Sequence, residues 1–217
     1  MRYVQKLDTP RFFIRWTKGL GIWNDCKISK EPLRRYILKH EQNNLCIYCE
    51  SKITSMKSSS HIEHIQPKHL DIPNLTFDYK NIAVSCNGNG ENISGDKTNY
   101  NCGHRKDKND TPYNDELFLN PVIEKDIRDY FKYDFDDCLI CTSDKDIEKA
   151  QYMIDTLHLN DGGLLKAREK ALKNFINEMK KITNIKIRKE KMKEVLNRED
   201  IAFISFLRFK YKNFLEE

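Results

Sequence analysis

The sequence predicts an α+β protein in which a short block, stapled by a metal ion, is embedded in a mostly helical chain. Residues 46–106 are rich in Asn, Ser, Gly, Cys and His and show no sustained helical period. Because so short a block cannot bury much apolar surface, it needs a further stabilising element such as a bound metal ion. Residues 130–135 alternate between apolar and polar side chains, which is typical of a strand. From about residue 146, apolar residues recur at helical spacing.

The first region, residues 1–45, is expected to be helical packing structure. Ser29 can cap a helix whose apolar residues follow helical spacing between 33 and 40. Residues 42–44, Gln-Asn-Asn, end that helix and lead the chain to Cys46. Residues 1–28 carry bulky apolar side chains without a clean period, which indicates packing and nothing more specific.

The last region, residues 111–217, is expected to hold a hairpin followed by helices. The alternation at 130–135 and an apolar pair at 139–140 predict a β-hairpin or short meander. Amphipathic stripes at 150–157, 164–179 and 200–211 predict helices, and such stripes are far more often core than cofactor contacts. Because the metal-bound block at 46–110 needs packing partners, the three regions are not expected to fold independently.

Composition and charge restrict the class of protein. The chain has 217 residues, of which 39% are hydrophobic and 33% charged, which excludes collagen-like and disordered chains. No apolar run approaches the about 20 residues of a membrane span, and the N-terminus lacks the apolar stretch of a signal peptide, so we expect a cytoplasmic protein. The net charge is 38 − 33 = +5, and residues 166–212 carry 15 Lys and Arg against 6 Asp and Glu. Such a charge permits nucleic-acid binding without demonstrating it.

The cysteines point to metal rather than to disulfides, because they are odd in number and the chain looks cytosolic. Two pairs have the CxxC spacing at which both thiolates can bind one zinc ion. Cys46 and Cys49 form the first pair, and Cys86 and Cys102, which frame a loop rich in Gly and Asn, best complete a four-cysteine site. The rival second pair, Cys138 and Cys141, lies in the apolar, strand-like stretch. The remaining cysteine, at position 26, is most simply a small core residue.

Between the two halves of the cysteine site lies Glu63-His64, followed by Pro67. A carboxylate beside a histidine suits metal-dependent phosphodiester cleavage: Glu63 can hold a divalent cation, and His64 can accept a proton from water. In a strand the two side chains point to opposite faces, so the pair works only where the chain bends. Taken alone, Glu-His is common and a surface pair is the simpler interpretation. His61 can share the strand face of Glu63, although an exposed polar residue is the more common interpretation.

The order of these elements resembles an HNH nuclease with its ββα-metal site. The resemblance extends to the PtuB-like HNH proteins of Septu and retron antiphage defence systems, and it covers roughly residues 33–170. The segments that carry it are Cys46-x-Tyr-Cys-Glu50, Ile62-Glu-His-x-x-Pro-Lys68, Asp78-Tyr-Lys-Asn-Ile-x-x-Ser-Cys86, Cys102-Gly-x-x-Lys106 and Ala150-x-x-x-Ile154-x-x-Leu157-x-Leu-Asn160 with Leu165 and Arg168.

The resemblance implies roles for individual residues. Glu63 would be a ligand of a catalytic Mg²⁺ or Mn²⁺, His64 the general base, and Asn81 a brace that holds the loop by hydrogen bonds. The four-cysteine zinc would be structural. Many HNH proteins carry His or Asn shortly after the last zinc cysteine, and here Gly103 stands directly after it. The resemblance then suggests His104, one residue later, as the further catalytic ligand, with Asn101 as the other candidate. An ordinary surface histidine beside Arg105 and Lys106 is the alternative interpretation of His104.

The resemblance also implies partners. PtuB-like proteins act beside a PtuA-like ATPase, in some systems with a retron reverse transcriptase and its DNA–RNA product. Lys68, Arg105 and Lys106 lie close to the expected site and could contact phosphates. The C-terminal helices are candidates for the partner surface.

Three other functions remain open at this point. One is a non-catalytic, zinc-stapled nucleic-acid-binding module, and a second is an adaptor of the ATPase complex with a degenerate site. The third is a CxxC oxidoreductase, which predicts a redox-active pair and no bound zinc.

Overall fold

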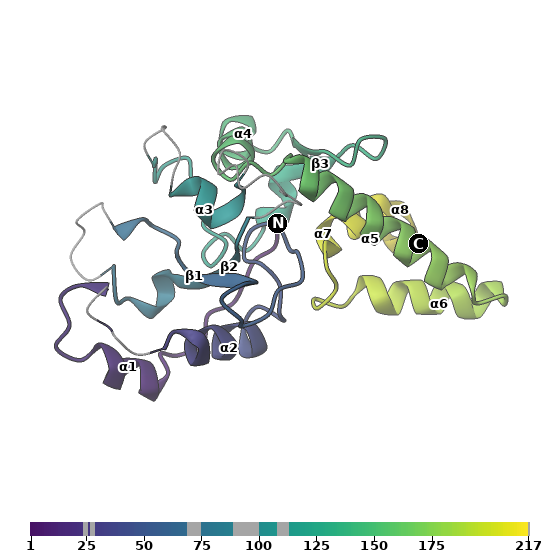
Figure 1. Ribbon diagram of the computed structural model, residues 1–217. Coiled ribbons are helices and arrows are strands. Elements are labelled where there is room, and N and C mark those ends of the chain that lie inside the picture. The colour runs from purple at the N-terminus through teal and green to yellow at the C-terminus, as the bar shows by residue number, and fades with distance from the viewer. Residues whose placement is uncertain (24–25, 27–28, 69–74, 89–99, 108–112, 217) are drawn as a thin grey trace.

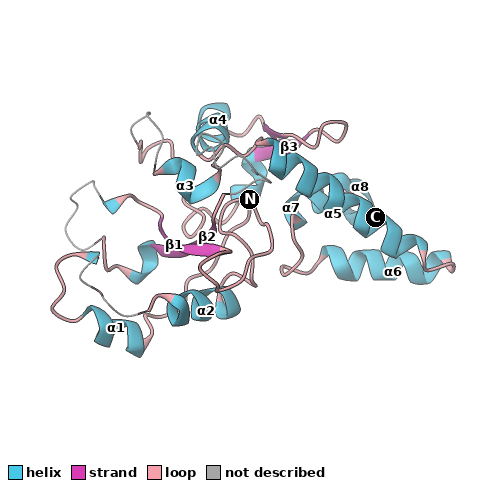
Figure 2. Cartoon of the chain, viewed as in Figure 1, coloured by secondary structure: helices cyan, strands magenta, loops and turns pink. Residues whose placement is uncertain are grey.

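The computed structural model describes residues 1–23, 26, 29–68, 75–88, 100–107 and 113–216. It is an α+β protein, as predicted, in which helices predominate over two short antiparallel strand pairs (Figures 1 and 2). The elements in chain order are α1 (Arg11–Thr17), α2 (Glu31–His40), β1 (Ser60–His64), the 3₁₀ turn η3 (Tyr79–Asn81), β2 (Ile82–Cys86), α3 (Cys102–Lys106), the 3₁₀ turn η5 (Ile127–Tyr130), β3 (Phe131–Tyr133), β4 (Ile140–Thr142), α4 (Ile147–Thr156), α5 (Gly162–Lys180), α6 (Ile185–Leu196), α7 (Ile204–Lys210) and α8 (Lys212–Glu216).

The first sheet pairs β1 with β2, so that Glu63 lies opposite Ala83 and His64 opposite Ile82. In Figure 1, α1 and α2 lie on one side of this sheet and α3 on the other. Ile82 and Val84 are fully buried. Because the short sheet is covered on both sides, its side chains are withdrawn from water, and the expected catalytic pair lies inside the protein.

Helix α2 begins with Glu31 and Pro32, an acidic residue and a proline in the first turn, which both favour a helix start. The predicted helix is confirmed, but its N-cap is Lys30 and not Ser29; the Ser29 hydroxyl accepts from the Glu31 N–H (3.3 Å) one residue earlier. Just beyond its end, the fully buried Gln42 donates from Nε2 to the carbonyl of Val84 (2.8 Å) and accepts from the Val84 amide (2.8 Å). The Gln42 side chain thereby satisfies the backbone N–H and carbonyl of Val84, as a neighbouring strand would. It also fixes β2 against the segment that leads to Cys46.

The second sheet, β3 with β4, is the predicted hairpin, with Phe131 opposite Thr142. The amide of Asn160 bonds both the N–H and the carbonyl of Ile140 (2.9 Å each). The buried Arg168 of α5 donates to the carbonyls of Cys138 (3.0 Å) and Leu159 (2.6 Å). Buried backbone carbonyls need such donors, so these two side chains attach the hairpin to α4 and α5.

Helices α5 and α6 form a pair that extends away from the rest of the chain, while α7 returns toward the hairpin (Figure 1). The carboxylate of Glu199 holds this return, because it binds Arg128 at 2.6 Å and Arg208 at 2.7 Å. Helices α4, α5 and α7 match the predicted stripes. The third stripe begins late, at Ile204, because Phe203 has left-handed backbone (φ 55°). Among the described residues, no helix has the length and apolar character to cross a membrane.

Helix α6 lies in the region expected to be helical, but no separate stripe was predicted for it. Most of its apolar residues are not buried, and Ile185 and Ile187 are 68% and 54% exposed. The expected division of the chain at residues 46 and 110 stays a prediction.

Candidate metal centre and catalytic site

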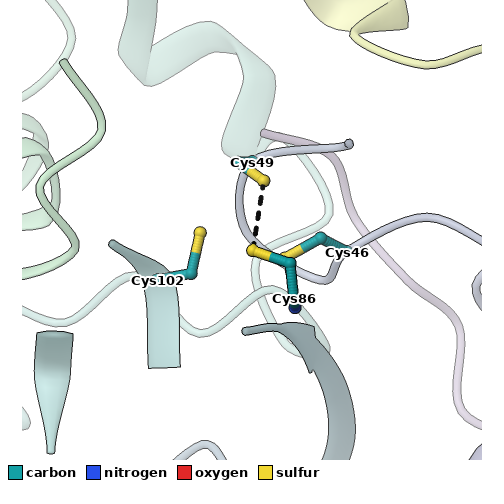
Figure 3. A group of neighbouring side chains, drawn as sticks. All are labelled: Cys46, Cys49, Cys86 and Cys102. Carbon is teal, nitrogen blue, oxygen red and sulfur yellow. Dashed lines mark hydrogen bonds between the residues drawn. The ribbon is translucent and has the colours of Figure 1, made fainter. Parts of the chain in front are cut away.

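The four sulfurs of Cys46, Cys49, Cys86 and Cys102 lie within 4.8 Å of one another, and Figure 3 shows the side chains converging. Cys49 Sγ and Cys86 Sγ are 3.8 Å apart. Four sulfurs bound at about 2.3 Å around a tetrahedral zinc are also about 3.8 Å apart. The cluster therefore fits a structural zinc ion in size and in donor type.

Each cysteine is placed by a different local feature. Cys46 and Cys49 lie in a turn that is closed by Cys46 N–H donating to the Ser51 carbonyl (2.9 Å). Cys86 ends β2, and its N–H donates to Cys46 Sγ (3.3 Å), a bond that favours the thiolate form of Cys46. Cys102 begins α3 with left-handed backbone (φ 56°), which turns its side chain back toward the other three.

The rival pair is not part of this cluster. Among the described residues, the four cysteines above are the one group of three or more metal-ligating side chains within ligand distance. Cys138 is buried in the hairpin connection and Cys141 lies half-buried on β4. Cys26 is buried, in keeping with a small core residue.

Without a cation, neighbouring cysteines of the cluster shift one another's pKa. Burial raises the pKa of the Cys102 thiol well above its usual value, and hydrogen bonds to the neighbouring sulfurs raise it further. For Cys46, burial opposes ionisation, but hydrogen bonds from the other three thiols outweigh it and lower the pKa well below the usual value. The bare cluster thus favours the thiolate at Cys46 and the thiol at Cys102, and a divalent cation would favour ionisation of both.

Glu63 is buried on β1 and is 1% exposed. Its Oε1 accepts from Tyr48 Oη (2.8 Å) and pairs with Lys106 Nζ (3.1 Å). Burial raises the pKa of Glu63, but the Lys106 charge and the neighbouring donors outweigh burial and lower it to about 2. The buried carboxylate is therefore ionised at neutral pH, as a cation ligand must be.

The second oxygen of Glu63 faces His61. Oε2 lies 3.4 Å from His61 Nε2, and neither atom has a hydrogen-bond partner within the described part of the chain. The His61 side chain is 21% exposed, so it is more deeply placed than the surface residue that the sequence suggested. Burial lowers the pKa of His61, but the Glu63 carboxylate outweighs burial and the pKa is raised. Two unpaired buried polar atoms are costly unless a ligand joins them, and a divalent cation fits that demand.

His64, the expected general base, ends β1 and is 6% exposed. Its Nε2 lies 3.0 Å from the Thr76 carbonyl, and its ring meets the Trp23 ring edge-on at 4.7 Å. A carbonyl only accepts, so Nε2 carries the proton and Nδ1 keeps its lone pair. Burial lowers the pKa of His64 to about 4. The imidazole is therefore neutral at pH 7 and able to accept a proton.

Asn81 bonds to the chain that follows β1. Its Oδ1 accepts from the Gln66 N–H (2.8 Å), and its Nδ2 donates to the carbonyls of Gln66 (3.0 Å) and Leu75 (3.1 Å). One side chain thus joins both sides of the bend after His64, the kind of contact that a brace makes.

The remaining expected residues are spread over different surroundings. Asn101 lies at the cysteine cluster, where its Oδ1 is 3.6 Å from Cys86 Sγ. The ring of His104 stacks on His61, with centroids 3.9 Å apart. Lys68 is exposed and Arg105 half-buried. The Lys106 side chain has no exposed surface, and its Nζ also reaches the His64 carbonyl (3.1 Å).

Lys106 therefore differs from the expectation of a phosphate contact. The buried Glu63 carboxylate requires a counter-charge, and Lys106 supplies it from α3 while its own side chain is withdrawn from solvent. In this structure its charge is paired with Glu63.

A cleft of about 430 Å³ adjoins the site and is lined by Lys52, Lys166 and Lys170, with Ser and Asn side chains between them. Asn87 belongs to this lining, and its Oδ1 lies 3.4 Å from His61 Nδ1. The exposed lysines of α5 thus lie along a cleft that borders the cysteine cluster at Cys86 and Asn101, which is an arrangement suited to an anionic chain.

Sequence reasoning did not identify Tyr48 as part of the site, and it did not indicate that Lys106 is buried there. Tyr48 stands between the two cysteines of the first pair, where it contributes to the family resemblance but was given no role in the site. His61 had a usable signal, its position two residues before Glu63 on one strand face.

Comparisons with known proteins agree with the resemblance seen in the sequence. The chain is 31% identical over 144 residues to the "Retron Vc95 putative HNH endonuclease" of Vibrio cholerae serotype O1 biovar El Tor, which covers 64% of this chain and 63% of that relative. It is 25% identical over 142 residues to the "Septu protein PtuB" of Bacillus thuringiensis, covering 65% of this chain and 44% of that relative. The matched segment thus spans less than two thirds of either relative. No family model matches the chain.

Both relatives carry names of the family that the motifs indicated. The predicted resemblance to the HNH proteins of Septu and retron systems is therefore confirmed.

Proposed function

We propose that the chain is a metal-dependent HNH endonuclease that hydrolyses phosphodiester bonds. The observation that carries the proposal is a buried, ionised Glu63 with one unpaired oxygen, next in sequence to a neutral His64 and adjoining a four-cysteine cluster. The order β1, β2, α3 around these residues supports a ββα-metal core. The names of the two relatives support the same assignment.

The chain's own residues would divide the work as follows. His64 Nδ1 takes a proton from the water whose oxygen attacks the phosphorus, because Nε2 is committed to the Thr76 carbonyl. Glu63 holds the cation, and Tyr48 and Lys106 fix the carboxylate. Asn81 keeps the bend after His64 in place. A bound Mg²⁺ or Mn²⁺ would supply stabilisation of the charge on the phosphate and on the leaving 3′ oxygen.

The proposed setting is antiphage defence in the cytoplasm, with the chain as effector of a PtuA-like ATPase, with or without a retron reverse transcriptase and its DNA–RNA product. The names of the relatives support this setting. The exposed Ile185 and Ile187 of α6 are the candidate partner contacts. Ile185→Glu with Ile187→Glu should abolish co-purification with the neighbouring ATPase while leaving zinc content unchanged; undiminished co-purification would contradict this assignment.

The test of catalysis compares the wild type with His64→Ala on plasmid, single-stranded DNA and total RNA, with Mg²⁺ present and zinc measured in both proteins. His40→Ala, which removes an exposed histidine of α2, is the matched control. Cleavage by the wild type and the control, absent in His64→Ala at equal zinc, would support the proposal and identify the substrate class.

The competing function is a zinc-stapled nucleic-acid-binding or adaptor subunit without activity. It is favoured if neither protein cleaves in the presence of the ATPase partner while both bind nucleic acid or the partner equally. The lysine-lined cleft serves either function, whereas the Glu63 oxygen without a hydrogen bond and the neutral His64 favour catalysis.

A further inference from the structure

Gly103 of α3 lies directly against two side chains of β1, those of Glu63 and His61. A Cβ atom built on Gly103 would overlap Glu63 Oε2 and would lie 2.7 Å from Glu63 Cδ and 2.9 Å from His61 Nε2. The Gly103 N–H donates to Ser85 Oγ (3.2 Å), which holds the backbone at this place. Glycine is thus required here because the two side chains of β1 occupy the position of its side chain.

The orientation of His61 follows from its other nitrogen. Asn87 Nδ2 donates to the Lys57 carbonyl (2.9 Å), which directs Asn87 Oδ1 toward His61 Nδ1 (3.4 Å). With the ring proton on Nδ1, the Asn87 oxygen accepts it. In that tautomer His61 Nε2 turns a lone pair toward Glu63 Oε2, which is the arrangement that a shared cation requires. Histidine ligands of metals characteristically donate their other N–H to an oxygen in this way.

The separation of the two atoms suits a shared cation. Ligands about 2.1 Å from one ion lie about 3.0 Å to 3.4 Å apart for angles between about 90° and 110°. Glu63 Oε2 and His61 Nε2 are 3.4 Å apart. Both atoms are buried and without a hydrogen-bond partner among the described residues, so a cation would satisfy them together.

The two residues that the sequence offered as the further ligand fit less well. Asn101 Oδ1 is engaged with Cys86 Sγ on the zinc side. His104 stacks its ring on His61 and also packs against Tyr100, with centroids 5.4 Å apart. Its ring therefore supports the His61 ring from one face.

We propose that His61 and Glu63 together hold the catalytic divalent cation, that Gly103 leaves room for these two ligand side chains, and that His104 positions His61 by stacking. The helix position directly after the last zinc cysteine carries no ligand here, and a histidine two residues before the glutamate replaces it. This inference rests on the proposed function and names its metal ligands.

The test measures Mn²⁺ binding to the zinc-loaded protein by electron paramagnetic resonance of free Mn²⁺, without substrate. His61→Phe and His104→Phe are a matched pair, since both keep a ring for the stack and remove the nitrogen donors. Gly103→Ala keeps every ligand but displaces Glu63 Oε2, whose partner oxygen is clamped by Tyr48 and Lys106. Gly162→Ala is its control, because a Cβ at Gly162 meets nothing within 4 Å.

We expect one Mn²⁺ site in the wild type, weakened about tenfold or more in His61→Phe and Gly103→Ala and changed less than about threefold in Gly162→Ala. His104→Phe, which keeps the stacking ring, should weaken Mn²⁺ binding clearly less than His61→Phe does. Zinc content and melting temperature identify any variant that fails to fold, and the inference is then judged on the Mn²⁺ affinities of the remaining variants. Absence of Mn²⁺ binding in the wild type, wild-type binding in His61→Phe, or equal losses in both histidine variants would overturn the inference. Binding as expected, without cleavage of any substrate even in the presence of the ATPase partner, would sustain it and refute the nuclease instead.

Discussion

Two buried Tyr–Glu hydrogen bonds in this protein allow the role of Tyr48 to be measured against an internal standard. Tyr48 Oη donates to Glu63 Oε1 at 2.8 Å, and Tyr79 Oη donates to Glu41 Oε1 at 2.7 Å. Both rings are buried, and each carboxylate also pairs with a lysine. Tyr48→Phe and Tyr79→Phe therefore remove the same kind of bond at nearly constant volume, one inside the candidate site and one outside it.

Both substitutions should cost similar stability. A hydrogen bond to a charged group contributes about 1.5–3 kcal/mol, which lowers the melting temperature of a chain this long by about 3–12 °C. Only Tyr48→Phe should also affect the site, because Glu63 loses the donor that orients it. We expect Mn²⁺ affinity and kcat/KM to fall about 10–100-fold for Tyr48→Phe and to stay near wild type for Tyr79→Phe.

The measurements are thermal unfolding, Mn²⁺ binding and initial cleavage rates at one temperature well below both transitions. Equal losses of activity in the two variants would show that global stability, not the orientation of Glu63, controls the site. A melting temperature unchanged in Tyr48→Phe would refute the hydrogen-bond argument itself.

Three further outcomes follow from the geometry. Cys86→Ser should reduce bound zinc from one ion per chain to nearly none and lower the melting temperature, while Cys141→Ser should keep the zinc, as metal analysis by mass spectrometry will show. Burial raises the pKa of Glu199, but its two arginine partners outweigh burial and lower it below its unfolded value of about 4.3. Its stabilisation is therefore present above about pH 4.3 and is lost as the pH falls through the lowered pKa. Because the carboxylate is 41% exposed, Glu199→Gln should cost only up to about 1 kcal/mol in urea unfolding at pH 7, and this cost should shrink as the pH falls through the lowered pKa. Lys166→Glu with Lys170→Glu should weaken nucleic-acid binding and reduce the slope of log K against log salt by about 0.7 to 0.9 for each phosphate that the variant no longer neutralises; an unchanged slope would remove the cleft from the binding surface.

The sequence allowed the cysteine cluster to be predicted because zinc selects a residue type and a short spacing, and both are visible in one dimension. Cys46 and Cys49 are three residues apart, and Cys86 and Cys102 frame a single loop. Helix α6 was not identified as a separate helix because most of its surface is exposed to solvent. It therefore lacks the apolar stripe of a helix that is buried along one face.

The catalytic neighbourhood was harder to predict because it depends on which charges the fold buries. Lys106 looked like one of many basic residues, and only the packing of α3 on β1 brings it to Glu63. His61 looked like a surface residue, yet its ring nitrogen is withdrawn from solvent beside a carboxylate. Neither fact has a local signal, since burial of a polar group is decided by partners distant in sequence.

The two candidate metal sites share one short stretch of backbone, and this makes them interdependent. Cys102 contributes a sulfur to the zinc cluster, and the next residue, Gly103, faces Glu63 and His61. Ser85 ties the two together, since its Oγ accepts from the Gly103 N–H (3.2 Å) and lies 3.7 Å from Cys46 Sγ. Because α3 has only five residues, it has little structure of its own to hold Gly103 in place. Zinc at the cysteines would therefore do more than stabilise the fold. It would hold the backbone of Gly103, which leaves room for the side chains of Glu63 and His61. Loss of zinc should then abolish binding of the catalytic cation without altering any of the cation's own ligands.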